Sequence, residues 1–221
     1  MEKRFGNVYV KRFLYFNVYV IKGKNGDVLI DTGFICMRSS LRRWIKRRKF
    51  NIRLIILTHA HVDHVWNADY LSKKFKAKIA MCEDDVINLD NSRIHAKPLK
   101  RRYGLWTRLM NLGMKLFRPP KFKVDILLND KKVLRRFGLK LDIIKLSGHT
   151  DGSIGILYNK NLFVGDALVY RGKYPTVAYQ CQNVDDAKHA VSIIDTIHPD
   201  RIFVGHDMFI ESDEFDVEKA C

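Results

Sequence analysis

The chain has 221 residues, of which 47% are hydrophobic, and its 40 lysine and arginine residues against 24 acidic residues give a formal charge of +16. This length and hydrophobic content suffice for one domain with a full core, so residues 1–221 are expected to form a single domain. No run of about 18 apolar residues occurs, which argues against a membrane span. The first residues lack the features of a signal peptide, which favours a cytoplasmic protein.

The first half of the chain is predicted to build strands and then to alternate helices with strands. Alternating apolar and polar residues and a turn signal at 24–27 mark the strands, and apolar residues at helical spacing mark the helices. The predicted elements are strands at Val8–Val20, Val28–Asp31 and Leu54–Leu57, a helix at Ser39–Lys49, a helix at Val62–Phe75 and a strand at Ala77–Met81.

The second half is predicted to repeat this order of strands followed by a helix and a closing strand. The same periodicities define its elements. They are strands at Lys132–Phe137, Leu139–Leu146, Ser153–Tyr158 and Leu162–Val164, a helix at Val184–Ile197 and a strand at Arg201–Val204.

A basic and apolar insertion at about residues 83–120 separates the two halves. Within it, the segment Leu99–Phe117 is predicted to form one or two helices, interrupted at Gly104 or Gly113 and ended by the prolines at 119–120. Three roles are open: a lid over the functional site with Tyr103 or Trp106 lining an apolar pocket, a homodimer contact, or a helix lying on an anionic membrane surface.

Positive charge is concentrated in two tracts without acidic residues. One lies on the helix predicted at 39–49, and the other runs from residue 91 to residue 124 after Asp90. Such tracts attract nucleic acid and anionic membrane surfaces. The alternative is that they form an ordinary solvated surface, because basic residues alone do not identify a partner.

The motif His59, His61, Asp63 and His64 follows directly after the strand predicted at 54–57. Imidazole and carboxylate groups bind zinc and similar metals, and side chains at positions i and i+2 of an extended segment point the same way. A single histidine here could be an ordinary hydrogen-bonded residue. Four titratable groups packed together would be costly without a metal, so the motif predicts metal ligands.

Four other predicted strands also end in a histidine or an aspartate. Asp31, His149, Asp166 and His206 follow the apolar runs at 28–30, 141–146, 162–164 and 202–204. Repetition of this pattern predicts one site assembled at one edge of a sheet system.

In order and spacing, these five motifs resemble the metallo-β-lactamase superfamily, in its lactonase and glyoxalase II-like hydrolase branch. The resemblance runs from Val18 to Asp207 and implies an α/β fold, a four-layer αβ/βα sandwich, with two divalent metal ions. Zinc is the implied metal, with manganese or iron as alternatives. Carried over residue by residue, the resemblance assigns His59, His61 and His149 to the first metal, Asp63, His64 and His206 to the second, Asp166 as the bridge, and Asp31 as a carboxylate that orients the histidine loop.

The resemblance implies a binuclear metal-dependent hydrolase that uses metal-bound hydroxide, with Asp63 and Asp166 as catalytic carboxylates. Lactamases usually have Cys or Ser at the position of Asp166, so β-lactamase activity is not expected. Hydroxyacylglutathione hydrolases extend further, with basic residues, whereas residues 207–221 are mostly acidic, which disfavours glutathione thioesters. The expected substrate is a small-molecule ester, lactone or thioester. The alternatives are a phosphodiesterase or nuclease acting on a polyanion and a mononuclear iron persulfide dioxygenase.

Overall fold

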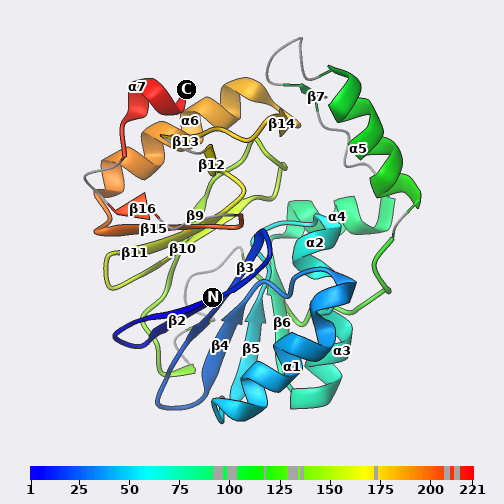
Figure 1. The fold of residues 1–221 in the computed structure, drawn as a ribbon, viewed down its shortest axis with the longest axis vertical. Helices are drawn as coiled ribbons and strands as arrows, with labels where there is room; N and C mark the ends of the chain where they lie inside the picture. The colour runs from blue at the N-terminus through cyan, green and yellow to red at the C-terminus, as the bar shows by residue number, and fades with distance from the viewer. Residues whose placement is uncertain are drawn as a thin grey trace.

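Four layers make up the fold, with two sheets facing each other and helices on both outer surfaces (Figure 1). The computed structural model describes residues 1–91, 97–98, 104–116, 118–128, 134, 137–171, 174–206, 210–211 and 215–221. Apolar side chains that alternate along the strands form one core between the two sheets. Two further cores lie between each sheet and the helices that cover it. This arrangement agrees with the predicted α/β sandwich.

The first sheet is built from the N-terminal half, as an antiparallel meander that continues into parallel strands. Parallel pairing begins where helices connect the strands, because such pairs need crossover connections. In spatial order its strands are β1 (Glu2–Phe5), β2 (Val8–Phe13), β3 (Phe16–Ile21), β4 (Asp27–Ile30), β5 (Ile52–Ile56), β6 (Lys78–Met81) and β8 (Ile126–Leu127).

The second sheet is built from the C-terminal half, and only its β11–β15 pair is parallel. In spatial order its strands are β16 (Ile210–Glu211), β15 (Arg201–Val204), β11 (Asn161–Gly165), β10 (Ile154–Tyr158) and β9 (Asp142–Lys145). Two short antiparallel pairs stand apart, namely β12 (Val169–Arg171) with β13 (Tyr174–Thr176), and β7 (Lys97–Pro98) with β14 (Gln180–Cys181).

Helices cover the outer faces of both sheets (Figure 1). In the first half they are η1 (Ile35–Met37), α1 (Arg38–Arg47), α2 (Val62–Val65), α3 (Ala68–Phe75) and α4 (Glu83–Asn91). Helix α5 (Gly104–Leu116) follows in the chain and contacts β7. In the second half they are α6 (Val184–Ile197) and α7 (Val217–Ala220). Among the described helices, none combines the length and the apolarity that crossing a bilayer requires.

Aromatic rings join the two sheets beside the ends of their central strands. Tyr19 of β3 contacts the rings of Phe163 and Phe203 at centroid distances of 5.1 and 5.4 Å, and those two rings stack at 4.8 Å. The Tyr19 hydroxyl donates a hydrogen bond to the Val204 carbonyl. These contacts hold the end of β15 against the first sheet, which positions the loop that follows β15.

The single helix predicted over 62–75 is wrong, because the chain breaks into α2 and α3 at Trp66–Asn67. The buried side-chain amide of Asn67 donates to the carbonyls of Thr32, Gly33 and Phe34 at 2.9, 3.1 and 2.9 Å. These bonds satisfy the backbone of the loop after β4, and they fix that loop against the start of α3.

Other local predictions also differ from the structure. Strands β1 and β16 were not predicted. Of the strand predicted at 132–137, the described residues Leu134 and Phe137 lie in 3-10 turns, and the others lie outside the described residues. Both side chains are nevertheless buried in the core between the sheets, which explains why the apolar pattern suggested a strand.

Within the segment predicted as one or two helices at 99–117, the described residues form one helix, α5, which continues through Gly113 without interruption. Three leucines at helical spacing on α5, Leu105, Leu109 and Leu112, are 72%, 57% and 54% exposed. Tyr103 and the side chain of Trp106, which the lid hypothesis places over the site, lie outside the described part of the chain. The lid, dimer and membrane roles therefore stay predictions.

Replacing Asn67 with alanine should destabilise the fold by about 2–4 kcal/mol, because three carbonyls and the Arg38 guanidinium would lose a buried partner. Urea unfolding would measure the change. The exposed Asn51 is a matched control, and Asn51→Ala should change stability by less than about 0.5 kcal/mol. Equal stability of Asn67→Ala and the unmodified protein would contradict this role.

Candidate metal centre

The predicted ligand residues converge where strands of both sheets end. The loop after β5 carries the motif at 59–64, and its last residues form α2. His149 follows β9, Asp166 follows β11, and His206 follows β15. Groups at the carboxyl ends of such strands meet at one edge of the sheets, so the sequence-predicted residues are all brought together.

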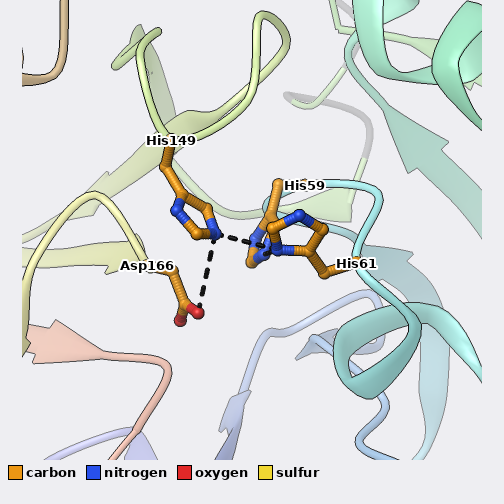
Figure 2. Close-up of side chains that lie close together, drawn as sticks. All are labelled: His59, His61, His149 and Asp166. Carbon is orange, nitrogen blue, oxygen red and sulfur yellow. Dashed lines mark hydrogen bonds and ion pairs between the residues drawn. The ribbon is translucent and has the colours of Figure 1, made fainter. Parts of the chain in front are cut away.

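The first cluster contains His59, His61, His149 and Asp166, whose ligand atoms all lie within 4.8 Å of one another. Figure 2 shows their side chains pointing toward a common centre. His61 Nδ1 lies 3.1 Å from His59 Nε2 and 2.9 Å from His149 Nε2. Nitrogens about 2.0 Å from one tetrahedral ion stand roughly 3.3 Å apart, so these separations fit a shared cation.

The second cluster contains Asp63, His64 and His206, and Asp166 lies between the two clusters. Asp166 Oδ2 lies 3.1 Å from His206 Nε2 and 3.7 Å from His149 Nε2, and Asp166 Oδ1 lies 3.4 Å from His64 Nε2. Asp63 Oδ2 lies 3.3 Å from His206 Nε2. One carboxylate thus contacts histidines of both clusters.

Hydrogen bonds on the outer side of the rings determine which nitrogen faces inward. His149 Nδ1 contacts the Gln180 carbonyl at 2.9 Å, and His206 Nδ1 contacts the Tyr15 carbonyl at 3.2 Å. A carbonyl only accepts, so both Nδ1 atoms carry protons, and in the neutral ring Nε2 presents its lone pair to the cluster. His64 Nδ1 contacts Asp31 Oδ2 at 2.9 Å in the same manner.

The donor set fits metal ions. His64 Nε2 and Asp166 Oδ1 are buried and have no hydrogen-bond partner in the described part of the protein. A buried polar atom without a partner is costly, and imidazole nitrogen and carboxylate oxygen are ordinary zinc ligands. The two atoms lie 3.4 Å apart, so one cation could satisfy both.

Electrostatics differ between the two clusters. Burial, together with the neighbouring imidazoles, lowers the pKa of His59 and lowers that of His61 to about 3, so both rings are neutral at pH 7. At His206, burial opposes the charged form, but Asp166 and Asp63 overcome it and raise the pKa to about 10. The carboxylates therefore make the second cluster favourable for positive charge.

Asp31 fixes the start of the loop that carries the motif. Its carboxylate accepts from the Thr58 backbone N–H at 2.9 Å and from the Thr58 hydroxyl at 2.8 Å, in addition to its contact with His64. The Thr58 hydroxyl in turn lies 3.1 Å from His59 Nδ1. The orienting role expected for Asp31 thus has a direct structural basis.

Asp85 ties two ligand loops together and was not predicted. This fully buried residue on the first turn of α4 accepts from the Ala60 N–H at 2.7 Å, the Thr150 hydroxyl at 2.8 Å and the Gly152 N–H at 3.0 Å. Ala60 lies between His59 and His61, and Thr150 follows His149. The contact joins the two halves, and no local pattern around Asp85 indicates it.

Comparisons of the sequence with known proteins indicate a single family. The sequence model of a family described as the metallo-beta-lactamase superfamily matches residues 13–206. A probable metallo-hydrolase of Methanocaldococcus jannaschii is 32% identical over 203 residues, covering 86% of each chain. Hydroxyacylglutathione hydrolase GloC of Haemophilus influenzae is 29% identical over 147 residues, which is 65% of this chain and 62% of that protein.

Solved structures share the fold. A metallo-beta-lactamase family protein of Thermus thermophilus aligns with a TM-score of 0.71 at 19% identity, over 97% of this chain and 78% of that chain. A subclass B3 metallo-beta-lactamase of Bradyrhizobium japonicum aligns with a TM-score of 0.67 at 21% identity, over 90% and 75% of the two chains. At these identities the likeness concerns the fold, which confirms the predicted four-layer sandwich.

Replacing Gly205 with alanine should disrupt the centre while leaving most of the fold intact. The added Cβ would overlap Asp166 Oδ1 and approach His64 Cε1 to 2.6 Å. The affinity for metal should fall at least about tenfold, as it does when contacts that position ligands are lost. Elemental analysis after dialysis at a limiting metal concentration would show this as a lower metal content. Gly113 has open space around it, so Gly113→Ala is the control and should bind metal normally. Unchanged metal binding by Gly205→Ala would refute the arrangement.

Proposed function

The chain belongs to the metallo-beta-lactamase superfamily, and we propose that it is a binuclear metal-dependent hydrolase of small-molecule esters, lactones or thioesters. The observation that carries this proposal is the position of Asp166, which contacts histidines of both clusters. A carboxylate shared between two complete sets of donors suits a bridging ligand better than a ligand of one ion.

In this proposal, each cluster holds one divalent ion. His59, His61 and His149 would hold the first ion, Asp63, His64 and His206 would hold the second, and Asp166 would serve as a ligand to both. Two bound ions, zinc or alternatively manganese or iron, supply hydroxide at neutral pH and polarise the oxygen of the scissile group.

The protein's own residues orient the reaction. Asp63 and His206 are the most accessible members, with side chains 23% and 21% exposed, whereas the His64 side chain is 2% exposed. The substrate therefore approaches from the side of Asp63 and His206. Asp63 would accept a hydrogen bond from the nucleophile and align it, and the proton that Asp63 or Asp166 takes up from the nucleophile would pass to the leaving group.

The matched relatives and the residue at position 166 guide the choice of substrates to test. Hydroxyacylglutathione hydrolases are among the matched proteins, which supports thioesters. Glutathione thioesters therefore belong in the substrate screen as one thioester among several. Asp166, in place of the Cys or Ser usual in lactamases, disfavours β-lactams.

The two alternative functions have distinguishable signatures. A persulfide dioxygenase would hold one iron ion, whereas the second cluster here has its own carboxylate and two imidazoles. A phosphodiesterase or nuclease would draw on the basic surface, and its nucleic-acid binding would weaken steeply with salt. A screen with lactone, thioester and phosphodiester substrates separates these classes.

Protein purified without chelator should contain two metal ions per chain by elemental analysis. His59→Ala should lower the metal content and abolish hydrolysis, because it removes a nitrogen from the first cluster. His189 is an exposed histidine on α6, and His189→Ala should match the unmodified protein. Reproducible recovery of one ion or none would rule out the binuclear proposal.

Asp166→Asn should reduce kcat/KM at least about 100-fold on any confirmed substrate, because the bridging charge is lost while the side-chain volume is kept. Turnover and thermal unfolding would be measured together, so that a folding defect is recognised. Asp195→Asn, on the exposed side of α6, is the control. Full turnover by Asp166→Asn would exclude the bridging role.

A further inference from the structure

A cavity lies on the outer side of the first sheet, between the β2–β3 hairpin and α1. Its volume is about 480 Å³, which lies within the range of small-molecule sites. It is distinct from the metal-ligand clusters, with which it shares no residue. Its lining residues are Lys11, Arg12, Phe13, Leu14, Ser40, Arg43, Trp44 and Arg47.

The charge of this cavity is uniformly positive. Four of its eight lining residues are cationic and none is acidic. The surrounding sequence has no acidic residue from 3 to 26 or from 32 to 62. Glu2 pairs with Lys11 across β1 and β2, but its carboxylate bonds to Arg48 Nε at 2.6 Å. Like charges held together repel one another, so an anion bound among them would be stabilised.

The guanidinium groups that line the cavity are held in place by hydrogen bonds and suit phosphate binding. Arg43 Nη2 contacts the Ser40 hydroxyl at 3.4 Å, and Arg12 Nε donates to the Leu14 carbonyl at 2.9 Å. These contacts hold one guanidinium on α1 and one on the hairpin. Guanidinium groups bind phosphate oxygens in pairs of parallel hydrogen bonds, and a hydroxyl adds a further donor.

The cavity also offers apolar surface. Leu14 at the hairpin tip is 78% exposed, and the Phe13 ring lies beneath Lys11 with the ammonium 5.5 Å from its centroid. An inorganic anion would leave this surface uncovered. A ligand with phosphate groups and a planar or apolar body matches both parts of the cavity.

We propose that the cavity between the β2–β3 hairpin and α1 binds a nucleotide-sized ligand, with its phosphate groups on Arg43, Arg47, Arg12 and Lys11. The body of the ligand contacts Phe13 and Leu14. The same hairpin end reaches the candidate metal centre on its other side, because the Tyr15 carbonyl contacts His206 Nδ1 and the Phe16 ring lies 5.1 Å from the His206 ring.

Calorimetric titration of the metal-loaded protein with ADP tests this proposal. The double variant Arg43→Gln/Arg47→Gln removes two charges and keeps good helix formers on α1. Its ADP dissociation constant should rise about tenfold or more, as expected when charged hydrogen bonds are lost. Lys140→Gln/Lys188→Gln removes two exposed charges elsewhere, and it should change the constant less than twofold. Thermal unfolding of both double variants checks that they fold.

Adenosine and a single-stranded oligothymidylate complete the design. Adenosine should bind at least about tenfold more weakly than ADP, because it lacks the phosphates. ADP binding that is equal in the Arg43→Gln/Arg47→Gln variant would place the nucleotide elsewhere, including at the metals, and would overturn the proposal. An equal loss in both double variants would show only long-range attraction. Binding of the oligonucleotide without ADP binding would show an extended polyanion surface instead. Both results would also overturn it.

Discussion

Two buried carboxylates that are not candidate ligands, Asp31 and Asp85, hold the loops on which the centre depends. Asp31 binds the backbone and hydroxyl of Thr58 and the outer nitrogen of His64. Asp85 binds backbone groups on both sides of the gap between the sheets. Several hydrogen bonds from protein donors replace the water around each carboxylate and offset the free-energy cost of burying its charge. The same hydrogen bonds restrict the motion of the loops. Contacts within the protein thus fix the positions of the candidate ligand side chains.

The two clusters are electrostatically complementary. Neutral imidazoles dominate the first, where burial and mutual repulsion keep the rings uncharged. In the second, Asp63 and the neighbouring Asp166 favour positive charge on His206. Asp166 belongs to both environments, and its own pKa is held well below the usual range because the charges of His206 and His64 outweigh its burial. Charge is therefore balanced across the pair of clusters rather than within each one.

The fold class and the convergence of the candidate residues on one edge could be predicted, because both follow from local patterns. Apolar runs that end in His or Asp identify strand ends, and the spacing of the 59–64 motif identifies a turn from strand to helix. Asp85 and the Gln180 carbonyl could not be predicted, because their roles arise from contacts between segments far apart in the sequence. The break at Asn67 was missed for the same reason. Its side chain bonds to the loop after β4, and this tertiary contact outweighs the helical periodicity of 62–75.

The contact between Asp85 and the loop at 150–152 also has a consequence for folding. Motif 59–64 is local and can form early, but His149, Asp166 and His206 reach it only after long chain loops have closed. Closing such loops is entropically costly and slows folding. A cation meeting the unfolded chain finds only the motif, while the docked chain offers both clusters. Most of the binding energy is then available only to the closed state, so a bound ion would slow the separation of the two halves.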